Sequence, residues 1–137
     1  MSYPIITKKY HFCASHKYGN DSWSEEKNIE VFGKDYNNHG HNYILEVSIT
    51  GPINPDTGWL VDLQQLNQIV KAKVVNILDH SQIEENIAWF KDRQPSSEVI
   101  LVWIWEQIVK DIKDAVLHKL RLVETNSIHT DYYGPDQ

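Results

Sequence analysis

The stretch from His39 to Thr50 constrains the fold more than any other part of the sequence. From Tyr43 onward, apolar and polar side chains largely alternate, and several of the apolar ones are β-branched or aromatic. A period of two predicts a β-strand with one buried face. Six side chains fall on that face: His39, His41, Tyr43, Leu45, Val47 and Ile49. The strand therefore places two histidines beside an apolar face, where they need polar partners.

The rest of the chain supplies more strands and two helices. Strands are predicted over Pro4–Ser15, Leu117–Thr125 and Ser127–Tyr133. An apolar stripe running to Leu78 predicts a helix capped by Asp62, and Pro95-Ser96-Ser97 begins a second helix that continues to Ala115. Loops are predicted over Lys17–Ile29 and over Ser81–Gln94, the latter with a short helical piece.

This order of elements, β-β-α-α-β-β, predicts an α+β fold. We expect a four-stranded antiparallel sheet with two helices on one face. Such a sheet has two open edges, and open edges are usually covered or paired, often by another subunit.

Composition narrows the class of protein. The chain has 137 residues, 41% hydrophobic and 23% charged, which fits a single domain over 1–137. Its net charge of −6 argues against a general nucleic-acid binder. The only cysteine, Cys13, fits a reducing, cytoplasmic setting, and it is expected to be a small buried residue rather than a nucleophile. No signal peptide or membrane span is predicted.

The two strand histidines suggest a metal site. His39 and His41 lie two positions apart and so point the same way. His16 shares a predicted face with Phe12 and Ala14 and is the candidate for a third ligand. Zinc in a catalytic site takes three protein ligands and keeps a fourth position open. The alternative, an exposed polar pair, fits less well because the neighbouring residues on that face are apolar.

Three further groups carry weaker signals. Asp79 beside His80 could orient an imidazole for general acid–base catalysis, although a histidine that complements a helix C-terminus is the favoured interpretation. Asp35, four residues before His39, could be a ligand, a base or a turn residue. Glu98 and Glu124 by themselves indicate almost nothing.

Taken together, the motifs resemble the 6-pyruvoyl-tetrahydropterin synthase and 6-carboxytetrahydropterin synthase family. The resemblance covers nearly the whole chain. It rests on the segments Phe12-Cys13-Ala14-Ser15-His16, Phe32-Gly33-Lys34, His39-Gly40-His41-Asn42-Tyr43, Gly58-Trp59-Leu60-Val61-Asp62-Leu63, Leu78-Asp79-His80, Ser96-Ser97-Glu98 and Glu124-Thr125.

The resemblance implies a tunnelling fold, in which three subunits close a barrel, trimers pair into hexamers and active sites lie at subunit interfaces. It implies Zn²⁺ on His16, His39 and His41, and a substrate, 7,8-dihydroneopterin triphosphate. By the same resemblance, Asp79 and His80 form a catalytic pair. Glu124 holds the edge of the pterin, and Ser96, Ser97 and Glu98 line the pocket.

The sequence departs from the family most clearly at Asp35. The usual residue there is a cysteine that acts as the base, and the reference pKa values of the two side chains are about 8.5 and 3.9. Some members have glutamate at this place and are associated with release of 6-hydroxymethyl-dihydropterin, a folate precursor. Val99 and Cys13 also differ from the usual asparagine and serine.

Three hypotheses follow. The chain could be a zinc lyase that eliminates triphosphate, with Asp35 or His80 as the main base. It could instead cleave the side chain for folate, or form 6-carboxytetrahydropterin for queuosine. Finally, it could bind zinc and pterin without turnover.

Overall fold

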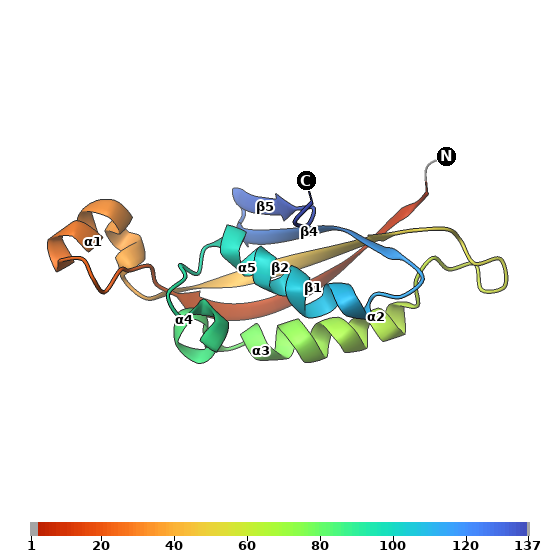
Figure 1. Cartoon of the computed structure of the whole chain (residues 1–137), viewed down its shortest axis with the longest axis horizontal. Helices are drawn as coiled ribbons and strands as arrows, with labels where there is room; N and C mark the ends of the chain where they lie inside the picture. Colours follow the sequence, from red (N-terminus) through yellow and green to blue (C-terminus); the bar gives the residue numbers. More distant parts are fainter. Residues whose placement is uncertain (1–2, 137) are drawn as a thin grey trace.

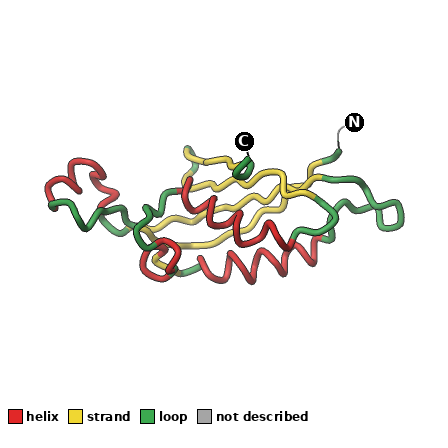
Figure 2. Tube along the Cα trace, in the orientation of Figure 1, coloured by secondary structure: helices red, strands yellow, loops and turns green. Residues whose placement is uncertain are grey.

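A five-stranded sheet with helices packed on one face forms the body of the computed structural model, which describes residues 3–136 (Figure 1). The strands, in the spatial order β3-β1-β2-β4-β5, are β1 (Ile5–His16), β2 (His39–Thr50), β3 (Ser81–Gln82), β4 (Val116–Thr125) and β5 (Ile128–Tyr132). The helices are α1 (Glu25–Phe32), α2 (Leu63–Val70), α3 (Asn76–Leu78), α4 (Ile83–Asn86) and α5 (Ser97–Ile108). Figure 2 shows α2 and α3 as one continuous helix, joined through a π-helical turn at Lys71–Val75. The predicted α+β class is confirmed.

The long strands pair as an antiparallel meander. β1 pairs with β2 along its whole length, from Ile5 opposite Thr50 to His16 opposite His39. β4 follows β2, and β5 follows β4. The alternation predicted from the sequence is present: Tyr43, Leu45, Val47 and Ile49 are all buried. Because the register between β1 and β2 is set along twelve positions, the residues that face each other at the two ends of this strand pair are fixed as well.

Helices α2–α3 and α5 cover the buried face. Asp62 caps α2 by accepting hydrogen bonds from the backbone N–H groups of Gln64 and Gln65. Ser96 caps α5 in the same way through Val99 N–H, at 3.2 Å. The helices and the sheet share one apolar core, whose fully buried helical members include Leu66, Val70, Val74, Leu78, Ile100, Leu101, Ile104 and Ile108. Each such side chain stabilises the fold by about 1.5–3 kcal/mol.

Several sequence-based expectations were wrong. The sheet has a fifth strand, β3, parallel to β1 at Ala14 and Ser15, and two residues are too few for a periodic signal. Part of the segment predicted as a loop forms α1, which Ser24 caps. The helix predicted to reach Ala115 ends at Ile108, before a 3₁₀ turn and the positive φ of Asp114.

Cys13 is also exposed rather than buried. The reason is that no helix among residues 3–136 covers the outer face of β1, so alternation leaves this thiol on a solvent-facing surface.

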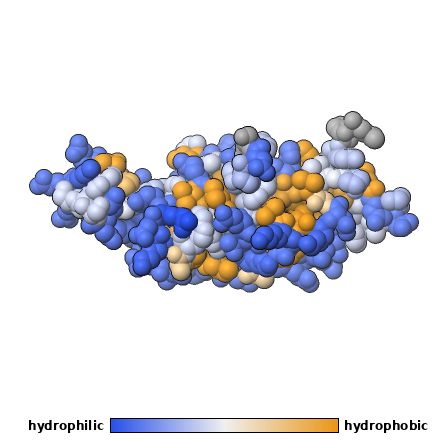
Figure 3. Space-filling model, viewed as in Figure 1, coloured by the Kyte–Doolittle hydropathy of each residue, from blue (hydrophilic) through white to orange (hydrophobic). Residues whose placement is uncertain are grey.

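Residues 17–38, here called the arm, leave the sheet between β1 and β2 and project beyond it (Figure 1, orange, at the left). Stacked rings hold the arm together, with Phe32 between Tyr18 and Trp23 at centroid distances of 5.7 and 5.9 Å. The buried side chain of Asn28 bonds to the surrounding backbone. Figure 3 shows apolar patches over the central body and only a small one on the arm. Among the described residues, the arm supplies none of the buried members of the main apolar core.

None of the helices among the described residues is long and apolar enough to cross a membrane.

Candidate metal and pterin site

Three histidines meet at the end of the sheet from which the arm projects. His16 is the last residue of β1, and the β1–β2 register sets it directly opposite His39. His41 follows on the same face of β2. Each ring offers one nitrogen, and these three atoms lie within 4.8 Å of one another. The candidate ligands predicted from the sequence are thus brought together.

Hydrogen bonds orient two of the rings. His16 Nδ1 donates to the carbonyl of Pro95 at 2.7 Å, and His39 Nδ1 donates to the carbonyl of Asn37 at 2.9 Å. A carbonyl only accepts, so each neutral ring carries its proton on Nδ1 and a lone pair on Nε2. The two Nε2 atoms are 3.0 Å apart. Two lone pairs at that distance repel, whereas a cation bound to both removes the repulsion.

The third ring has one nitrogen without a hydrogen-bond partner among residues 3–136. His41 Nε2 is buried and makes no hydrogen bond with any described residue. Burial lowers the pKa of His41, and the nearby His16 and His39 lower it further, while Glu124 opposes them. A neutral ring with an unpartnered buried nitrogen is costly unless something binds it. The donor set, three converging imidazole nitrogens, fits a zinc ion with an open fourth position.

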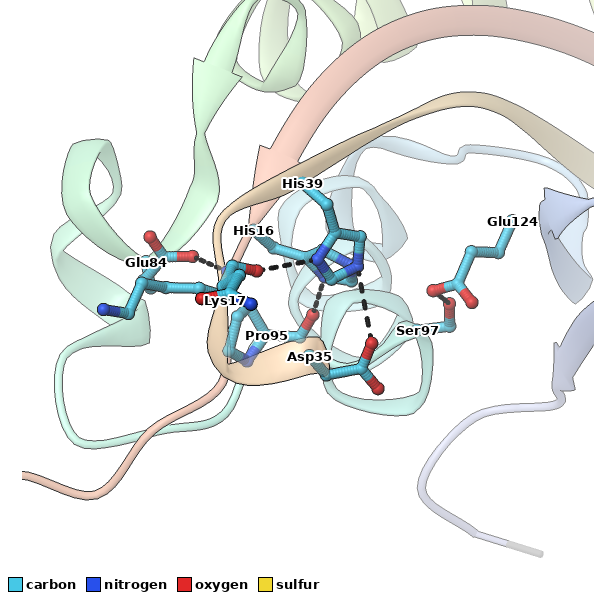
Figure 4. Close-up of polar contacts among 9 residues, drawn as sticks. His16, Lys17, Asp35, His39, Glu84, Pro95, Ser97 and Glu124 are labelled. Atoms are coloured by element: carbon cyan, nitrogen blue, oxygen red, sulfur yellow. Dashed lines mark hydrogen bonds and ion pairs between the residues drawn. The ribbon is translucent and has the colours of Figure 1, made fainter. Parts of the chain in front are cut away.

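Asp35 stands at the margin of this cluster. It lies in a 3₁₀ turn, Gly33–Tyr36, at the base of the arm, and its Oδ1 is 3.7 Å from His39 Nε2 (Figure 4). Its side chain is 60% exposed. The Asp35 carbonyl also accepts the Tyr18 N–H at 2.9 Å, which ties the two ends of the arm together. Asp35 can therefore reach a molecule bound at the histidines from the solvent side.

A second carboxylate lies near enough to the cluster to act on the charge of His41. Glu124, near the end of β4, accepts a hydrogen bond from the buried Ser97 Oγ at 3.1 Å (Figure 4). Ser96 is occupied in capping α5, and Glu98 is exposed in its first turn. The predicted pocket residues thus gather at the N-terminus of α5 and the facing strand.

Tyr18 links the two carboxylate regions, and sequence reasoning did not single it out. Its ring lies 5.4 Å from that of His16. Burial raises the pKa of Tyr18 to about 12, and the charges of Glu124, Asp35 and Glu98 contribute. Tyr43 is a second omission: its hydroxyl is buried beside His41 and has no hydrogen-bond partner within the described part of the chain. Only its place in the His-Gly-His-Asn-Tyr motif could have indicated it.

Asp79 and His80 lie elsewhere on the chain's surface. Asp79 Oδ1 accepts the Cys13 N–H at 2.9 Å, and its Oδ2 is 3.0 Å from His80 Nδ1. The Cys13 N–H, followed by His80, lowers the pKa of Asp79. His80 is in a left-handed conformation, φ 62°, and its side chain is 83% exposed. The pair follows the end of α3, as the helix-terminus interpretation predicted, and it is also an oriented acid–histidine pair.

Within one chain, this pair does not join the histidine cluster. No hydrogen bond or ion pair among residues 3–136 connects His80 with the three histidines. His80 borders a hollow that is also lined by His41 of the cluster, together with Cys13, Ser15, Gly40 and Asn42.

Both the sequence and the fold of this chain are similar to those of known proteins. Residues 5–135 match the sequence model described as 6-pyruvoyl tetrahydropterin synthase. The 6-pyruvoyl tetrahydrobiopterin synthase of Dictyostelium discoideum is 35% identical over 130 residues, which cover 95% of this chain and 96% of that protein. The human 6-pyruvoyl tetrahydrobiopterin synthase is 31% identical over 131 residues, with coverages of 94% and 90%. The structure of Caenorhabditis elegans 6-pyruvoyl tetrahydropterin synthase superposes with a TM-score of 0.86 at 28% identity, covering 98% of this chain and 99% of that one.

Proposed function

The chain belongs to the 6-pyruvoyl tetrahydropterin synthase family, and on that premise we propose that it is a zinc-dependent pterin lyase. Its substrate in this proposal is 7,8-dihydroneopterin triphosphate, and Asp35 takes the place of the usual cysteine. The observation that carries the proposal is the convergence of three imidazole nitrogens. The Nε2 atoms of His16 and His39 carry lone pairs, and His41 Nε2 has no hydrogen-bond partner among the described residues. The carboxylates of Asp35 and Glu124 lie nearby.

His16, His39 and His41 would hold the zinc. Two of the rings are already oriented by the Pro95 and Asn37 carbonyls, an arrangement that fixes the ligand tautomer before the metal binds. Bound zinc would supply Lewis acidity to hydroxyl groups of the substrate side chain and acidify the neighbouring C–H group.

Glu124 would hold the pterin ring. The edge of a pterin presents adjacent N–H donors, which a carboxylate accepts in a bidentate manner as it does those of arginine. The hydrogen bond from Ser97 fixes one carboxylate oxygen of Glu124. Ser96 and Glu98 occupy the same end of α5 and would line the pocket.

Asp35 would accept the proton from the substrate. Its carboxylate is close enough to the cluster to reach a bound side chain. A carboxylate has a much lower reference pKa than a thiol, so proton removal by Asp35 is expected to be slower than by cysteine.

Asp79 and His80 would act from a neighbouring copy of the chain. Asp79 holds His80 Nδ1, which leaves Nε2 free for proton transfer to a group outside the chain. In this proposal three copies close a barrel through their sheet edges, and two such trimers form a hexamer. The open edges of the sheet support the proposed assembly.

The carboxylate at position 35 favours one alternative function, side-chain cleavage to 6-hydroxymethyl-dihydropterin. Glutamate-bearing relatives are associated with that product, and aspartate has the same chemistry on a shorter side chain.

Product analysis tests the proposal. Zinc-loaded protein would be incubated with 7,8-dihydroneopterin triphosphate and the products identified by mass spectrometry. We expect a 6-pyruvoyl pterin and free triphosphate. A 6-hydroxymethyl product would establish the alternative, and bound pterin without any product would refute both enzyme hypotheses.

A further inference from the structure

The place of Asp35 depends on the arm, which supplies no described member of the buried core of the sheet. Asp35 lies in the 3₁₀ turn through which the arm returns to β2. Its side chain is largely exposed, so packing does not fix it. A carboxylate that removes a proton must come within about 2.6–3.2 Å of the group that carries it. Contacts at the base of the arm therefore decide whether Asp35 is in reach.

Two contacts tie the returning end of the arm to its outgoing end. The Tyr18 N–H donates to the Asp35 carbonyl at 2.9 Å. One residue earlier, the Lys17 ammonium lies 5.0 Å from the centre of the Tyr36 ring. The backbone of Asp35 therefore follows the backbone of residues 17–19.

Side chains from the body of the chain hold that outgoing backbone on both sides of Tyr18. Glu84, in α4, accepts the Lys17 N–H at 2.8 Å (Figure 4). Gln94, in the segment before α5, accepts the Gly19 N–H at 3.0 Å and donates to the Gly19 carbonyl at 2.6 Å. The Gln94 amide thus pairs with both polar groups of one residue, which fixes the direction of the arm as well as its distance.

The segment that holds the arm also orients a candidate zinc ligand. The carbonyl of Pro95, the next residue after Gln94, accepts from His16 Nδ1 at 2.7 Å. A planar peptide bond joins Gln94 to Pro95, so the two move together. This short segment therefore sets the position of the arm relative to the histidine cluster.

We infer that Gln94 and Glu84 are positioning residues, which hold the outgoing end of the arm so that Asp35 stays beside the histidine cluster. The inference rests on the proposed role of Asp35 as the base, and it adds the residues that place that base. Both act through the backbone of residues 17–19 and the Tyr18 hydrogen bond to Asp35. Loss of one anchor should move Asp35 without unfolding the sheet.

Steady-state kinetics of the zinc-loaded protein test this role. Gln94→Met keeps the length of the side chain and removes both hydrogen bonds to Gly19. We expect kcat for 7,8-dihydroneopterin triphosphate to fall by roughly tenfold, because misplacing a reacting group by about 1 Å can cost up to about 100-fold. KM and zinc affinity should stay at parental values, since Glu124 and the three histidines are unchanged. A loss of zinc affinity, or a higher KM with unchanged kcat, would overturn the positioning role.

Glu84 allows a conservative variant to be compared with a disruptive one. Glu84→Ala should lower kcat as Gln94→Met does. Glu84→Gln keeps an oxygen that can accept the Lys17 N–H and should retain most of the parental kcat. Glu85→Ala, at an exposed neighbour in α4, makes the same change in net charge as Glu84→Ala and should have no effect. Equal losses in Glu84→Gln and Glu84→Ala would assign the effect to charge and refute the anchor.

A double-mutant cycle separates positioning of the base from a general effect on the site. In an Asp35→Asn background there is no base left to misplace, so Gln94→Met should lower kcat no further. Effects that multiply in the double variant, as those of independent sites do, would refute the inference.

Hydrogen exchange of the metal-free protein reports on the arm without any reaction. Gln94→Met should speed deuterium uptake in peptides that cover residues 17–38. Gln68→Ala removes an exposed amide from α2 and should leave that uptake unchanged. Parental uptake in Gln94→Met would refute the anchor, whatever the kinetics. A parent protein that binds zinc and pterin but forms no product would instead refute the proposed function, and with it the role of Asp35 on which the inference rests.

Discussion

The histidine cluster and the Asp79–His80 pair use similar side chains in opposite ways. In the cluster, His16 is 1% exposed, and adjacent strands of one chain bring the three rings together. In the pair, the His80 side chain is 83% exposed. The cluster is complete within the fold, so it can bind an ion by itself. The pair is only oriented by the fold, so its chemistry needs a molecule or a chain from outside.

The largest effect is expected from substitutions that break the histidine cluster. His39→Ala with His41→Ala removes two of three ligands, and zinc affinity should fall by far more than the roughly 10–100-fold typical of losing a supporting residue. Zinc bound per chain would be measured by elemental analysis, and affinity by chelator competition. His118→Ala with His129→Ala removes two histidines outside the cluster and should keep the zinc. Unchanged zinc in the first variant would refute the metal site.

Removing the exposed histidine should affect the rate but not the metal. His80→Ala is expected to lower kcat by about 10²–10⁴, the usual contribution of a general acid or base. Zinc content and Tm should stay at parental values, because the side chain has few internal contacts. Loss of zinc in this variant would contradict the separation between the two regions.

Asp35 lies between the two cases, close to the cluster but exposed, and its effect should be smaller. Asp35→Asn keeps the size and removes the base, so kcat should fall by about 100-fold. Asp35→Cys restores the usual family residue and should raise the yield of 6-pyruvoyl product. Both variants would be compared by mass spectrometry of products at equal zinc content. Identical product profiles for all three proteins would show that this position does not set the chemistry.

The pH dependence of stability should reveal the hydrogen bonds that hold Asp79. Its pKa is lowered in the folded protein, so its stabilising contribution is present above the unfolded pKa of about 3.9 and is lost as the pH falls through the lower folded value. Tm measured between pH 5 and pH 2, roughly that window, should therefore fall more steeply for the parent than for Asp79→Asn. Asp56→Asn, in the exposed loop after β2, serves as the control and should retain the parental profile. Parallel curves for Asp79→Asn and the parent would argue against this account.

The smallest effect concerns a hydroxyl beside the cluster. Tyr43→Phe removes a buried group that has no partner, so the metal-free protein should lose no stability and could gain up to about 1–3 kcal/mol. Tyr10→Phe removes a hydroxyl that donates to Asn67 Oδ1 at 2.6 Å and should cost about 1 kcal/mol. Urea unfolding of both variants gives the comparison, and equal losses would mean that Tyr43 has a partner in solution.

Much of the site was predictable because it depends on local periodicity. Alternation alone placed His39 and His41 on the buried face of one strand, and it placed His16 on the face shared with Phe12. The cap at Asp62 and a serine cap within Pro95-Ser96-Ser97 were also predictable, because a capping side chain acts within three residues of itself; the structure shows that the serine is Ser96. The ligand set came together once β1 and β2 paired side by side in antiparallel order, with His16 opposite His39.

Other features depend on contacts between residues far apart in the chain, and sequence patterns do not report these. β3 exists because Ser81 meets Ala14, and the arm folds because Asn28 and Phe32 find partners within it. The tautomers of His16 and His39 depend on two backbone carbonyls, one of them from Pro95, 79 positions away.

The sequence by itself determined which residues have metal-binding chemistry and which strand faces carry them, because side-chain period is a local property. Only the tertiary structure decided that the three histidines converge and that His80 is exposed. It also set His16 directly opposite His39, because the register between strands far apart in the sequence is a tertiary property.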